Sequence, residues 1–289
     1  MNILSLFDGM SCGRIALDKA GVNVSKYYAS EIDKAAIKVA ATNYPNTVHV
    51  GAVENWKEWD INWSKIDLLI GGSPCQGFSF AGKQLAFDDP RSALFFVYID
   101  ILAHIREKNP NMKFMLENVK MQKKHLDIIS ENLGVEPMFI NSCLVSACER
   151  PRYYWFNFSV EPITPVNTVF GDVIDYSLTD NTMSDGWHKW WEKNKDFQIK
   201  KKYSRTVWPG QKGITMTARQ YASWNGNFVG TPEGKFRKPT KQELALLVGA
   251  NENYFDSVSQ RQAEMLSGNG WTIDVISHIF KTGFARQAA

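Results

Sequence analysis

The chain lacks the features that mark membrane, secreted and zinc-binding proteins. Its 289 residues include no stretch near the ~20 apolar residues that a membrane span requires. The four cysteines form no Cys-x-x-Cys pair, so we expect neither a zinc site nor a disulfide framework. No basic segment follows Met1, so we expect no signal peptide. These absences favour a reduced, cytoplasmic protein without a metal and without membrane contact.

The composition is that of an ordinary folded protein. Hydrophobic residues make up 44% and charged residues 22%, which argues against intrinsic disorder. The length suits one large domain, or one large domain with a small one.

Positive charge is concentrated in one segment. Residues 187–241 contain thirteen Lys or Arg and three Asp or Glu, a net charge of +10 in a chain of +3. The same segment carries ten aromatic residues. A basic, aromatic surface is typical of nucleic-acid binding, because phosphates attract cations and bases stack on rings. A solvated face over a small core is the alternative.

The first 155 residues alternate short apolar runs with helical patterns, which predicts an α/β fold with a mostly parallel sheet. After about residue 160 the periodicity fades, and helical patterns return at 241–249 and 274–280. We therefore expect a first domain over 1–159, a small irregular or β-rich lobe over 160–235, and a C-terminal segment, 236–289, that returns to the first domain. The expected strands are Ile3–Phe7, Lys26–Ser30, Thr47–Val50, Asp67–Ile70, Lys113–Leu116, Met138–Val145 and Arg152–Phe158.

A glycine loop follows the first expected strand. Gly9 and Gly13 lie between a strand and a helix, where the backbone can approach a ligand closely. Glu31 ends the second strand twenty-two residues after Gly9, and an acid at such a spacing can accept both hydroxyls of a ribose. The alternative is a plain tight turn with a helix-capping glutamate.

Three further segments follow strands and carry reactive groups. Cys75 lies in the rigid turn Ser73-Pro74-Cys75, where a thiolate nucleophile would be accessible; a small buried side chain is the alternative. Glu117 suits a proton donor whose pKa is raised by enclosure, or a helix cap. Arg150 and Arg152 suit a clamp on a phosphate or base edge, or two surface ion pairs.

Taken in order, these motifs resemble those of the C5-cytosine DNA methyltransferases. The resemblance rests on Phe7-Asp8-Gly9, Glu31, Pro74-Cys75-Gln76, Glu117-Asn118-Val119, Arg150-x-Arg152 and Gly268-Asn269-Gly270. It extends over nearly the full length and fails over about 160–235, where that family has its variable target-recognition region. It implies a Rossmann-like S-adenosylmethionine-dependent methyltransferase fold and is closest in form to compact bacterial or phage enzymes and to the catalytic domain of the animal de novo enzymes.

The resemblance also implies a mechanism. Cys75 would attack carbon 6 of a cytosine flipped out of duplex DNA, and Glu117 would protonate N3. Arg152 would contact O2, Arg150 would support the pocket, and Asn118 would shape the loop. Carbon 5 would then take the methyl group of S-adenosylmethionine, leaving S-adenosylhomocysteine as the product.

The cofactor contacts implied by the resemblance come from the strand ends and from two more distant segments. One position departs from the family: Ala52 stands where an Asp usually accepts a hydrogen bond from the adenine. Glu54 would point the same way if the third strand continued, and is one candidate substitute. An engineered change and a pocket opened for an altered cofactor are the alternatives. The implied cofactor residues are Phe7, Asp8, Gly9, Gly13, Glu31, Ile32, Ala52, Pro74, Leu94, Asn269, Gly270 and Trp271.

The expected DNA contacts lie in the loop after Cys75 and in the basic segment. The lysines, Arg205 and Arg219 suit backbone phosphates, and Arg219, Gln220 and Gln211 are also candidates for base edges. The full set is Gln76, Ser79, Lys83, Lys200, Lys201, Lys202, Arg205, Gln211, Lys212, Arg219 and Gln220.

The sequence is thus identified as that of a DNA (cytosine-5)-methyltransferase acting on double-stranded DNA. We expect a cytoplasmic monomer, either bacterial or encoded by a phage, with a restriction enzyme as a candidate functional partner. Two alternatives stay open: an RNA cytosine-5 methyltransferase, and a weakened or inactive member, suggested by Ala52, that acts as a DNA-binding protein.

Overall fold

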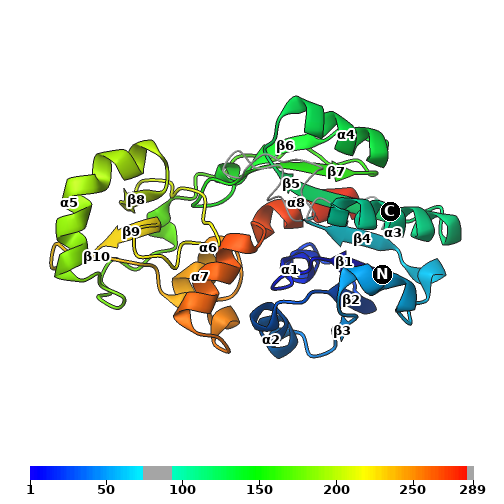
Figure 1. The fold of residues 1–289 in the computed structure, drawn as a ribbon, viewed down its shortest axis with the longest axis horizontal. Helices are drawn as coiled ribbons and strands as arrows, with labels where there is room; N and C mark the ends of the chain where they lie inside the picture. The colour runs from blue at the N-terminus through cyan, green and yellow to red at the C-terminus, as the bar shows by residue number, and fades with distance from the viewer. Residues whose placement is uncertain (74–92, 285–289) are drawn as a thin grey trace. The chain divides into compact units, whose positions relative to one another are not determined.

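A computed structural model describes residues 1–73 and 93–284, which fold into two compact units. The first unit comprises Met1–Ile140, Pro151–Glu161 and Ser277–Ala289. The second comprises Asn141–Arg150 and Pro162–Ile276. Figure 1 shows both units with their helices and strands labelled.

The first unit is built on a seven-stranded sheet in the order β3-β2-β1-β4-β5-β7-β6. Strands β3, β2, β1, β4 and β5 pair in parallel, and β7 pairs with β5 in the antiparallel direction. The carboxyl ends of the five parallel strands therefore meet at one edge. The strands are β1 Asn2–Leu6, β2 Lys26–Ser30, β3 Val48–His49, β4 Leu68–Gly71, β5 Lys113–Val119, β6 Met138–Asn141 and β7 Pro151–Phe156.

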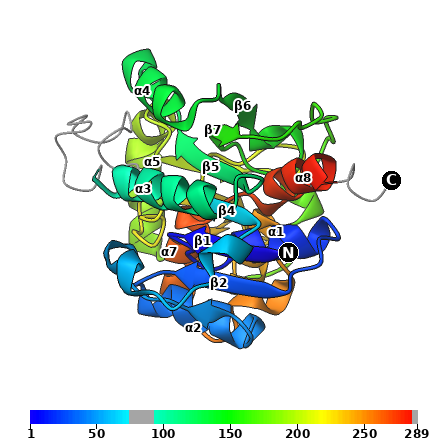
Figure 2. The ribbon, with the colours of Figure 1, turned by 90° about the vertical axis from the view of Figure 1, so that its right-hand side faces the viewer.

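Helices cover the sheet of the first unit. In both Figure 1 and Figure 2, α2 lies beside β2 at one end of the sheet, and α4 lies beside β6 and β7 at the other. The helical elements are α1 Cys12–Lys19, α2 Lys34–Asn43, η1 Val53–Glu58, η2 Trp63–Lys65, α3 Ala93–Lys108 and α4 Lys123–Leu133. Helix α8 spans Ile273–Phe284, and its part from Ser277 onward also belongs to the first unit.

Helix α3 contributes to a hydrophobic core of the first unit. It buries Phe95, Tyr98 and Ile105 on one face, and these pack with Leu4 and Leu6 of β1. Alternate residues of a strand point to the same face, so the even-numbered residues of β1 face this core and the odd-numbered residues face the other side of the sheet. The packing is close enough that a Cβ at Gly71 would lie 3.0 Å from the ring of Tyr98.

The second unit contains a three-stranded sheet in the order β10-β9-β8 and three longer helices. Trp187 and Trp191 of α5 pack on Phe228 of β9 and form a small core of their own. The elements are η5 Ser142–Leu144, η6 Phe170–Asp172, α5 Asp185–Lys200, β8 Ser204–Val207, β9 Gly226–Gly230, β10 Phe236–Arg237, α6 Lys241–Val248, η7 Glu252–Phe255 and α7 Gln260–Asn269.

The α/β class and the succession of the first seven strands along the chain agree with the sequence-based expectation, but two helices were not predicted. Helix α5 lies inside the segment expected to be irregular or β-rich, and α7 follows it. The start of each could have been recognised, because Ser184 caps α5 and the Ser259–Gln262 capping box begins α7.

The division into units differs from the predicted domains in two places. Residues 236–276 lie in the second unit, whereas we expected them to return to the first domain. The segment 141–150, expected in the first domain, also lies in the second unit. The reason is that α6 and α7 contact each other and pack within the second unit, and only the chain from Ser277 onward joins the first.

A buried ion pair holds the elements of the second unit together. The guanidinium of Arg237 is fully buried and donates to both carboxylate oxygens of Glu243 at 2.7 Å. It also donates to the backbone carbonyls of Asp175, Leu178 and Lys238. Glu243 in turn accepts from the backbone N–H groups of Asp175 and Thr240, which caps α6. One pair therefore joins β10, α6 and the 175–178 segment.

Arg237→Met is expected to lower the free energy of unfolding by about 3–5 kcal/mol, because it leaves the carboxylate of Glu243 buried without its cation. Urea unfolding followed by circular dichroism measures the change. The matched control is Lys235→Met, because Lys235 pairs with Asp185 in the same unit but both side chains are exposed. The control should lose at most about 1 kcal/mol. Equal losses would show that the buried pair has no special role.

Candidate functional site

The loop after β1 is held in an uncommon backbone conformation. Phe7, Gly9 and Ser11 have φ values of 56°, 58° and 61°, in the left-handed region. Such a conformation costs about 1–3 kcal/mol at each residue other than glycine, so neighbouring contacts must enforce it. The loop leads directly into α1, whose first turn contains the buried Gly13.

One such contact is the side chain of Asp8. Its carboxylate is buried and accepts hydrogen bonds from the hydroxyls of Tyr27, at 2.7 Å, and Ser11. Burial raises the pKa of Asp8, although the hydrogen bonds from Ser11, Ser5 and Tyr27 act against this shift. Asp8 therefore points into the protein, where its contacts help to fix the loop.

Glu31, at the end of β2, is joined to the glycine loop. One oxygen of its carboxylate accepts from the backbone N–H of Gly9 at 2.7 Å. The other accepts from the N–H groups of Ile32 and Asp33 at 2.8 and 2.9 Å. Asp33 itself caps α2. The side chain of Ile32 is 73% exposed, so an apolar surface lies next to a fixed carboxylate.

Beyond β3 the structure corrects one expectation. The strand ends at His49 and η1 begins at Val53, so the alternation that would have aligned Glu54 with Ala52 does not occur. Glu54 is exposed on η1. The backbone carbonyl of Gly51 accepts from the hydroxyl of Ser30 at 2.8 Å, which ties this segment to the end of β2.

The ends of β4 and β5 are joined by a side chain. The amide of Asn118 donates to the hydroxyl of Ser73 at 3.1 Å, and its carbonyl oxygen accepts from the N–H of Val119 at 2.8 Å. Sequence reasoning did not single out Ser73, although it directly precedes the Pro74-Cys75 turn. The predicted residues Pro74, Cys75, Gln76, Ser79 and Lys83 lie outside the described residues.

Glu117 and Arg152 form an ion pair beside this joint. Arg152 lies opposite Val119 in the β5–β7 pairing, two positions from Glu117, which places both side chains on one face. The distance between Arg152 Nε and Glu117 Oε1 is 2.8 Å, and both side chains are largely buried. A carboxyl group and a guanidinium are thus held together where β5 ends. Leu94, in the first turn of α3, packs against the neighbouring core.

Arg150 has a different environment from Arg152. In the second unit its guanidinium is buried and donates to the carbonyls of Met216, at 3.1 Å, and of Gly268 and Asn269, at 3.2 and 3.5 Å. Gly268 and Asn269 end α7, where a cation is favourable. The two arginines therefore do not form a common clamp, and Arg150 supports backbone. Asn269 is exposed, whereas Gly270 and Trp271 are partly buried.

The remaining cysteines among the described residues are structural in character. Cys12 and Cys148 are buried, and burial raises the pKa of Cys148 to about 12. A thiol with such a pKa stays protonated near neutral pH and is a weak nucleophile.

Two residues expected to contact DNA have internal partners instead. The ammonium of Lys212 donates to the backbone carbonyls of Cys143, Ser146 and Thr168. The side chain of Gln220 is buried and donates to the carbonyl of Glu264 and to the hydroxyl of Ser267. Both predictions are therefore corrected, because each polar group satisfies backbone or side-chain acceptors within the unit.

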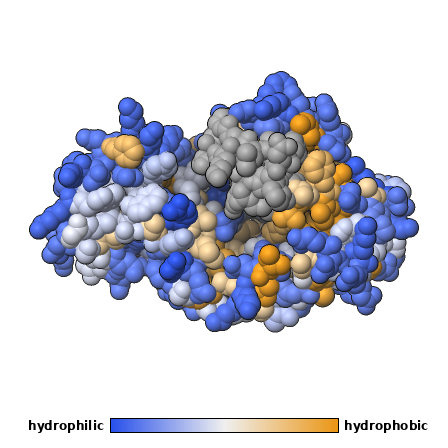
Figure 3. Space-filling view, in the orientation of Figure 1, coloured by the Kyte–Doolittle hydropathy of each residue, from blue (hydrophilic) through white to orange (hydrophobic). Residues whose placement is uncertain are grey.

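The other candidate DNA contacts in the second unit remain accessible. Lys200, Lys201, Lys202 and Arg219 are exposed, and Arg205 and Gln211 are partly buried. Figure 3 has the orientation of Figure 1 and shows that the surface around α5 is covered mainly by hydrophilic residues.

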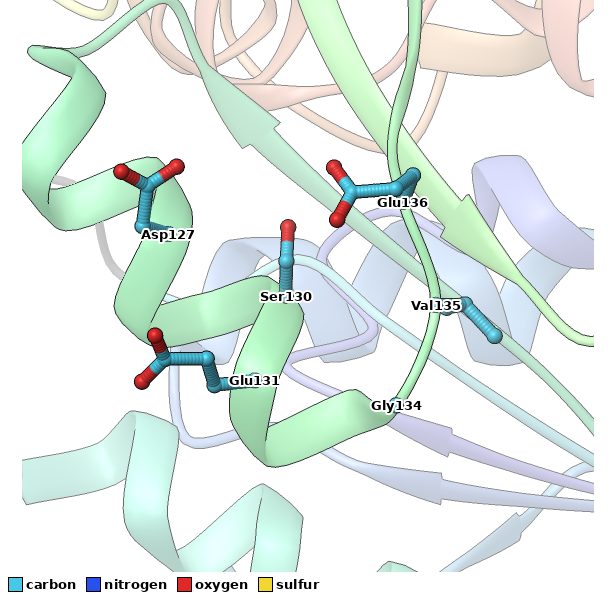
Figure 4. A pocket seen from close by; sticks show the side chains of 6 residues that line it. All are labelled: Asp127, Ser130, Glu131, Gly134, Val135 and Glu136. Carbon is cyan, nitrogen blue, oxygen red and sulfur yellow. The ribbon is translucent and has the colours of Figure 1, made fainter.

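A hollow of about 380 Å³ lies on α4 and the segment that follows it, and it contains none of the predicted site residues. Figure 4 shows three carboxylates around it, and these do not converge on one point. Its Ser130 hydroxyl accepts from the indole of Trp155. Within residues 1–73 and 93–284, no group of three or more His, Cys, Asp or Glu is placed to hold a metal. Nor does any helix of these residues have the length and apolarity to cross a membrane.

Comparison with known proteins gives consistent matches. A family model described as C-5 cytosine-specific DNA methylase matches residues 1–134. Type II methyltransferase M1.ScrFI of Lactococcus lactis subsp. cremoris is 30% identical over 305 residues, covering 96% of this chain and 76% of that protein. Orphan methyltransferase M.Rho11sI of Bacillus phage rho11s is 40% identical over 141 residues, but the match covers 46% of this chain and 27% of that one.

Solved structures agree on the fold. The S. pombe Dnmt2 methyltransferase superposes with a TM-score of 0.74 at 15% identity, with complete coverage of both chains. The Entamoeba histolytica methyltransferase EhMeth gives a TM-score of 0.76 at 16% identity, covering 99% of this chain and 98% of that one. At these identities the likeness establishes the Rossmann-like architecture.

Lys212→Met is expected to lower the free energy of unfolding by about 1–3 kcal/mol, because it removes the donor shared by three backbone carbonyls. Thermal or urea unfolding measures the loss. Lys200→Met is the matched control, since Lys200 is an exposed lysine of the same unit, and it should change stability by no more than about 0.5 kcal/mol. A Lys212 variant as stable as the control would restore Lys212 as a candidate surface contact.

Proposed function

Because the chain belongs to the C-5 cytosine-specific DNA methylase family, we propose that it methylates carbon 5 of a cytosine flipped out of duplex DNA, through a covalent adduct on Cys75. The enzyme is thus a DNA cytosine-5 methyltransferase, and what we add is the assignment of its residues. The observation that carries this assignment is the Glu117–Arg152 pair at the end of β5, next to the Ser73–Asn118 joint that precedes Cys75.

S-adenosylmethionine is the proposed methyl donor, and the residues at the first two strand ends suit it. A carboxylate has about four acceptor sites, and Glu31 uses three of them on backbone N–H groups, so one stays open to a ribose hydroxyl. The exposed Ile32 offers an apolar surface to the adenine. Phe7 and Gly9 would flank the methionine and adenosine parts. Bound S-adenosylmethionine supplies a methyl group from its sulfonium and becomes S-adenosylhomocysteine.

The chain's own residues would prepare the cytosine. The Cys75 thiolate adds to carbon 6, and the electron pair of the ring double bond moves toward carbon 5. Glu117 holds the N4 amino group and protonates N3, so negative charge does not accumulate on the ring. Arg152 orients Glu117 and contacts O2 of the base. After methylation, carbon 5 gives its proton to water, the bond between carbon 6 and sulfur breaks with the electron pair returning to the Cys75 thiolate, and the double bond re-forms. N3 returns its proton to the Glu117 carboxylate.

The basic surface of the second unit would hold the duplex. Lys200, Lys201 and Lys202 are exposed at the end of α5 and would neutralise backbone phosphates, which makes binding salt-sensitive. Arg205 and Gln211 remain candidate contacts.

The biological setting is part of the proposal. The relative M1.ScrFI carries a type II methyltransferase name, which supports pairing with a restriction enzyme. The phage relative carries an orphan name, which supports the opposite arrangement. We propose a cytoplasmic monomer in either case.

An inactive, DNA-binding member is the second candidate function. Ala52 favours it, because an alanine side chain accepts no hydrogen bond. Glu54 lies exposed on η1 rather than on an extension of β3, so it is not aligned with Ala52 as a strand would have aligned it.

The wild-type protein is expected to methylate a random-sequence duplex pool in one recurring context, and Cys75→Ser should abolish turnover because a hydroxyl is a far weaker nucleophile than a thiolate. Base-resolution sequencing of 5-methylcytosine measures both. The control is Cys143→Ser, which changes a partly buried cysteine elsewhere and should leave methylation unchanged. Methylation retained by Cys75→Ser, with its fold verified by circular dichroism, would refute the covalent role. If the protein methylates RNA and not duplex DNA, the substrate assigned here is wrong and the RNA alternative holds.

Ala52→Asp is expected to tighten the binding of S-adenosylhomocysteine about threefold to tenfold, because it adds a hydrogen-bond acceptor worth roughly 0.5–1.5 kcal/mol. Isothermal titration calorimetry gives the dissociation constants. Ala52→Leu is the control of similar size that cannot accept. If the Asp and Leu variants bind equally, the missing acceptor is not what sets cofactor affinity, and the case for a weakened member loses its basis.

A further inference from the structure

The turn over residues 217–225 of the second unit is fixed by side chains from several elements. The indole of Trp187 on α5 donates to the carbonyl of Ser223, and the hydroxyl of Ser204 on β8 donates to the carbonyl of Trp224. Gln220 is tied to α7 through the carbonyl of Glu264 and the hydroxyl of Ser267. These contacts come from three elements, and α7 lies well beyond α5 and β8 in the sequence.

A buried lysine completes this support. The ammonium of Lys238 donates to the carbonyls of Gln220 and Ala222. Burial lowers the pKa of Lys238, and the carboxylate of Glu264, 3.9 Å away, acts against that shift. Placing a charged group inside a protein is unfavourable unless it is well paired, and here its partners are the carbonyls of the turn.

The support acts on the backbone and leaves alternate side chains free to vary. Gln220 and Asn225 are buried, and Asn225 donates to the hydroxyl of Thr217 across the base of the turn. Arg219, Tyr221 and Ser223 are exposed. A rigid backbone that presents exposed side chains loses little conformational entropy on binding, which is the property expected of a recognition element.

The guanidinium of Arg219 is oriented by a neighbouring ring. Its Cζ lies 5.5 Å from the centre of the Trp224 ring, and Trp224 in turn meets Tyr203 edge to face at 6.1 Å. A guanidinium stacked on an aromatic face keeps a defined plane and still projects its donors outward. The lysines at 200–202, by contrast, are exposed point charges on flexible stems.

On the basis of the proposed function, we propose that Arg219 is the residue that recognises a guanine of the target DNA, by donating two hydrogen bonds to O6 and N7, and that Trp224 positions it. Arginine paired in this way with guanine is the commonest specific contact in the major groove. The recognised sequence then includes a G·C pair other than the methylated one. Phosphate contacts from Lys200–Lys202 place the protein on the duplex but carry no sequence information.

The test uses the full-length protein on a random-sequence duplex pool, with 5-methylcytosine sequenced at base resolution. Arg219→Lys keeps the charge and removes the two-pronged donor. It should lower the preference for one G·C pair between about 5-fold and about 150-fold and leave the other positions unchanged. Trp224→Leu should weaken the preference at the same position by a smaller factor, because the guanidinium remains but loses its fixed plane.

The matched control is Arg106→Lys. Arg106 is an arginine of the first unit whose Cζ lies 5.0 Å from the ring of Phe114, so the substitution removes an equivalent stacked guanidinium outside the turn. The control should leave the recognised sequence unchanged. Circular dichroism and thermal unfolding confirm that each variant folds, and a lower rate with an unchanged sequence preference marks a purely structural role.

Each outcome decides the matter. A selective loss at one G·C position supports the proposal. A uniform fall in rate across all sequences, with every sequence preference unchanged, would give Arg219 a phosphate-binding or structural role and overturn it. An unaltered preference in Arg219→Lys also overturns it, while the wild-type activity still stands. A folded wild-type protein that methylates no duplex contradicts the proposed function, and this inference falls with it.

Discussion

Backbone hydrogen-bonding groups left open at strand ends and in turns must find partners, and in both units buried side chains supply them. Glu31 accepts from three backbone N–H groups, and Arg150 donates to three carbonyls. Lys212 and Arg237 do the same for carbonyls of the second unit. The polar residues that shape the candidate site are thus also those that hold its backbone in place, so the fold and the site depend on one set of contacts.

The fold of the first unit could be predicted because the hydrophobic pattern of each strand and helix can be read from a short stretch of sequence. Short apolar runs alternate with amphipathic segments, and the register of a parallel sheet then brings the residues after β1, β2, β4 and β5 to one edge. The Gly9–Glu31 contact follows from this arrangement. The Ser73–Asn118 contact could not be predicted, because the sequence pattern alone does not show which side chain a small polar residue at a strand end will contact.

The second unit was harder to predict because its charge and aromatic content conceal the helical pattern. Trp187, Trp190 and Trp191 have helical spacing, but five tryptophans and thirteen basic residues nearby suggested a surface. Lys212, Arg237 and Lys238 contribute to the net charge of that segment and yet face inward. Composition counts charges without regard to the direction of each side chain, so it overstated the basic surface and led to the wrong role for Lys212.

The close approach of Gly268 to Thr217 has a consequence for variation in this chain. A Cβ at position 268 would lie 2.1 Å from the backbone carbonyl of Thr217, so no other residue fits without moving either α7 or the 217–225 turn. The exposed positions 219, 221 and 223 carry no such restriction. Related sequences can therefore diverge at the exposed positions while the backbone beneath them stays the same. Substitutions accumulated during evolution are then concentrated in the side chains that face outward.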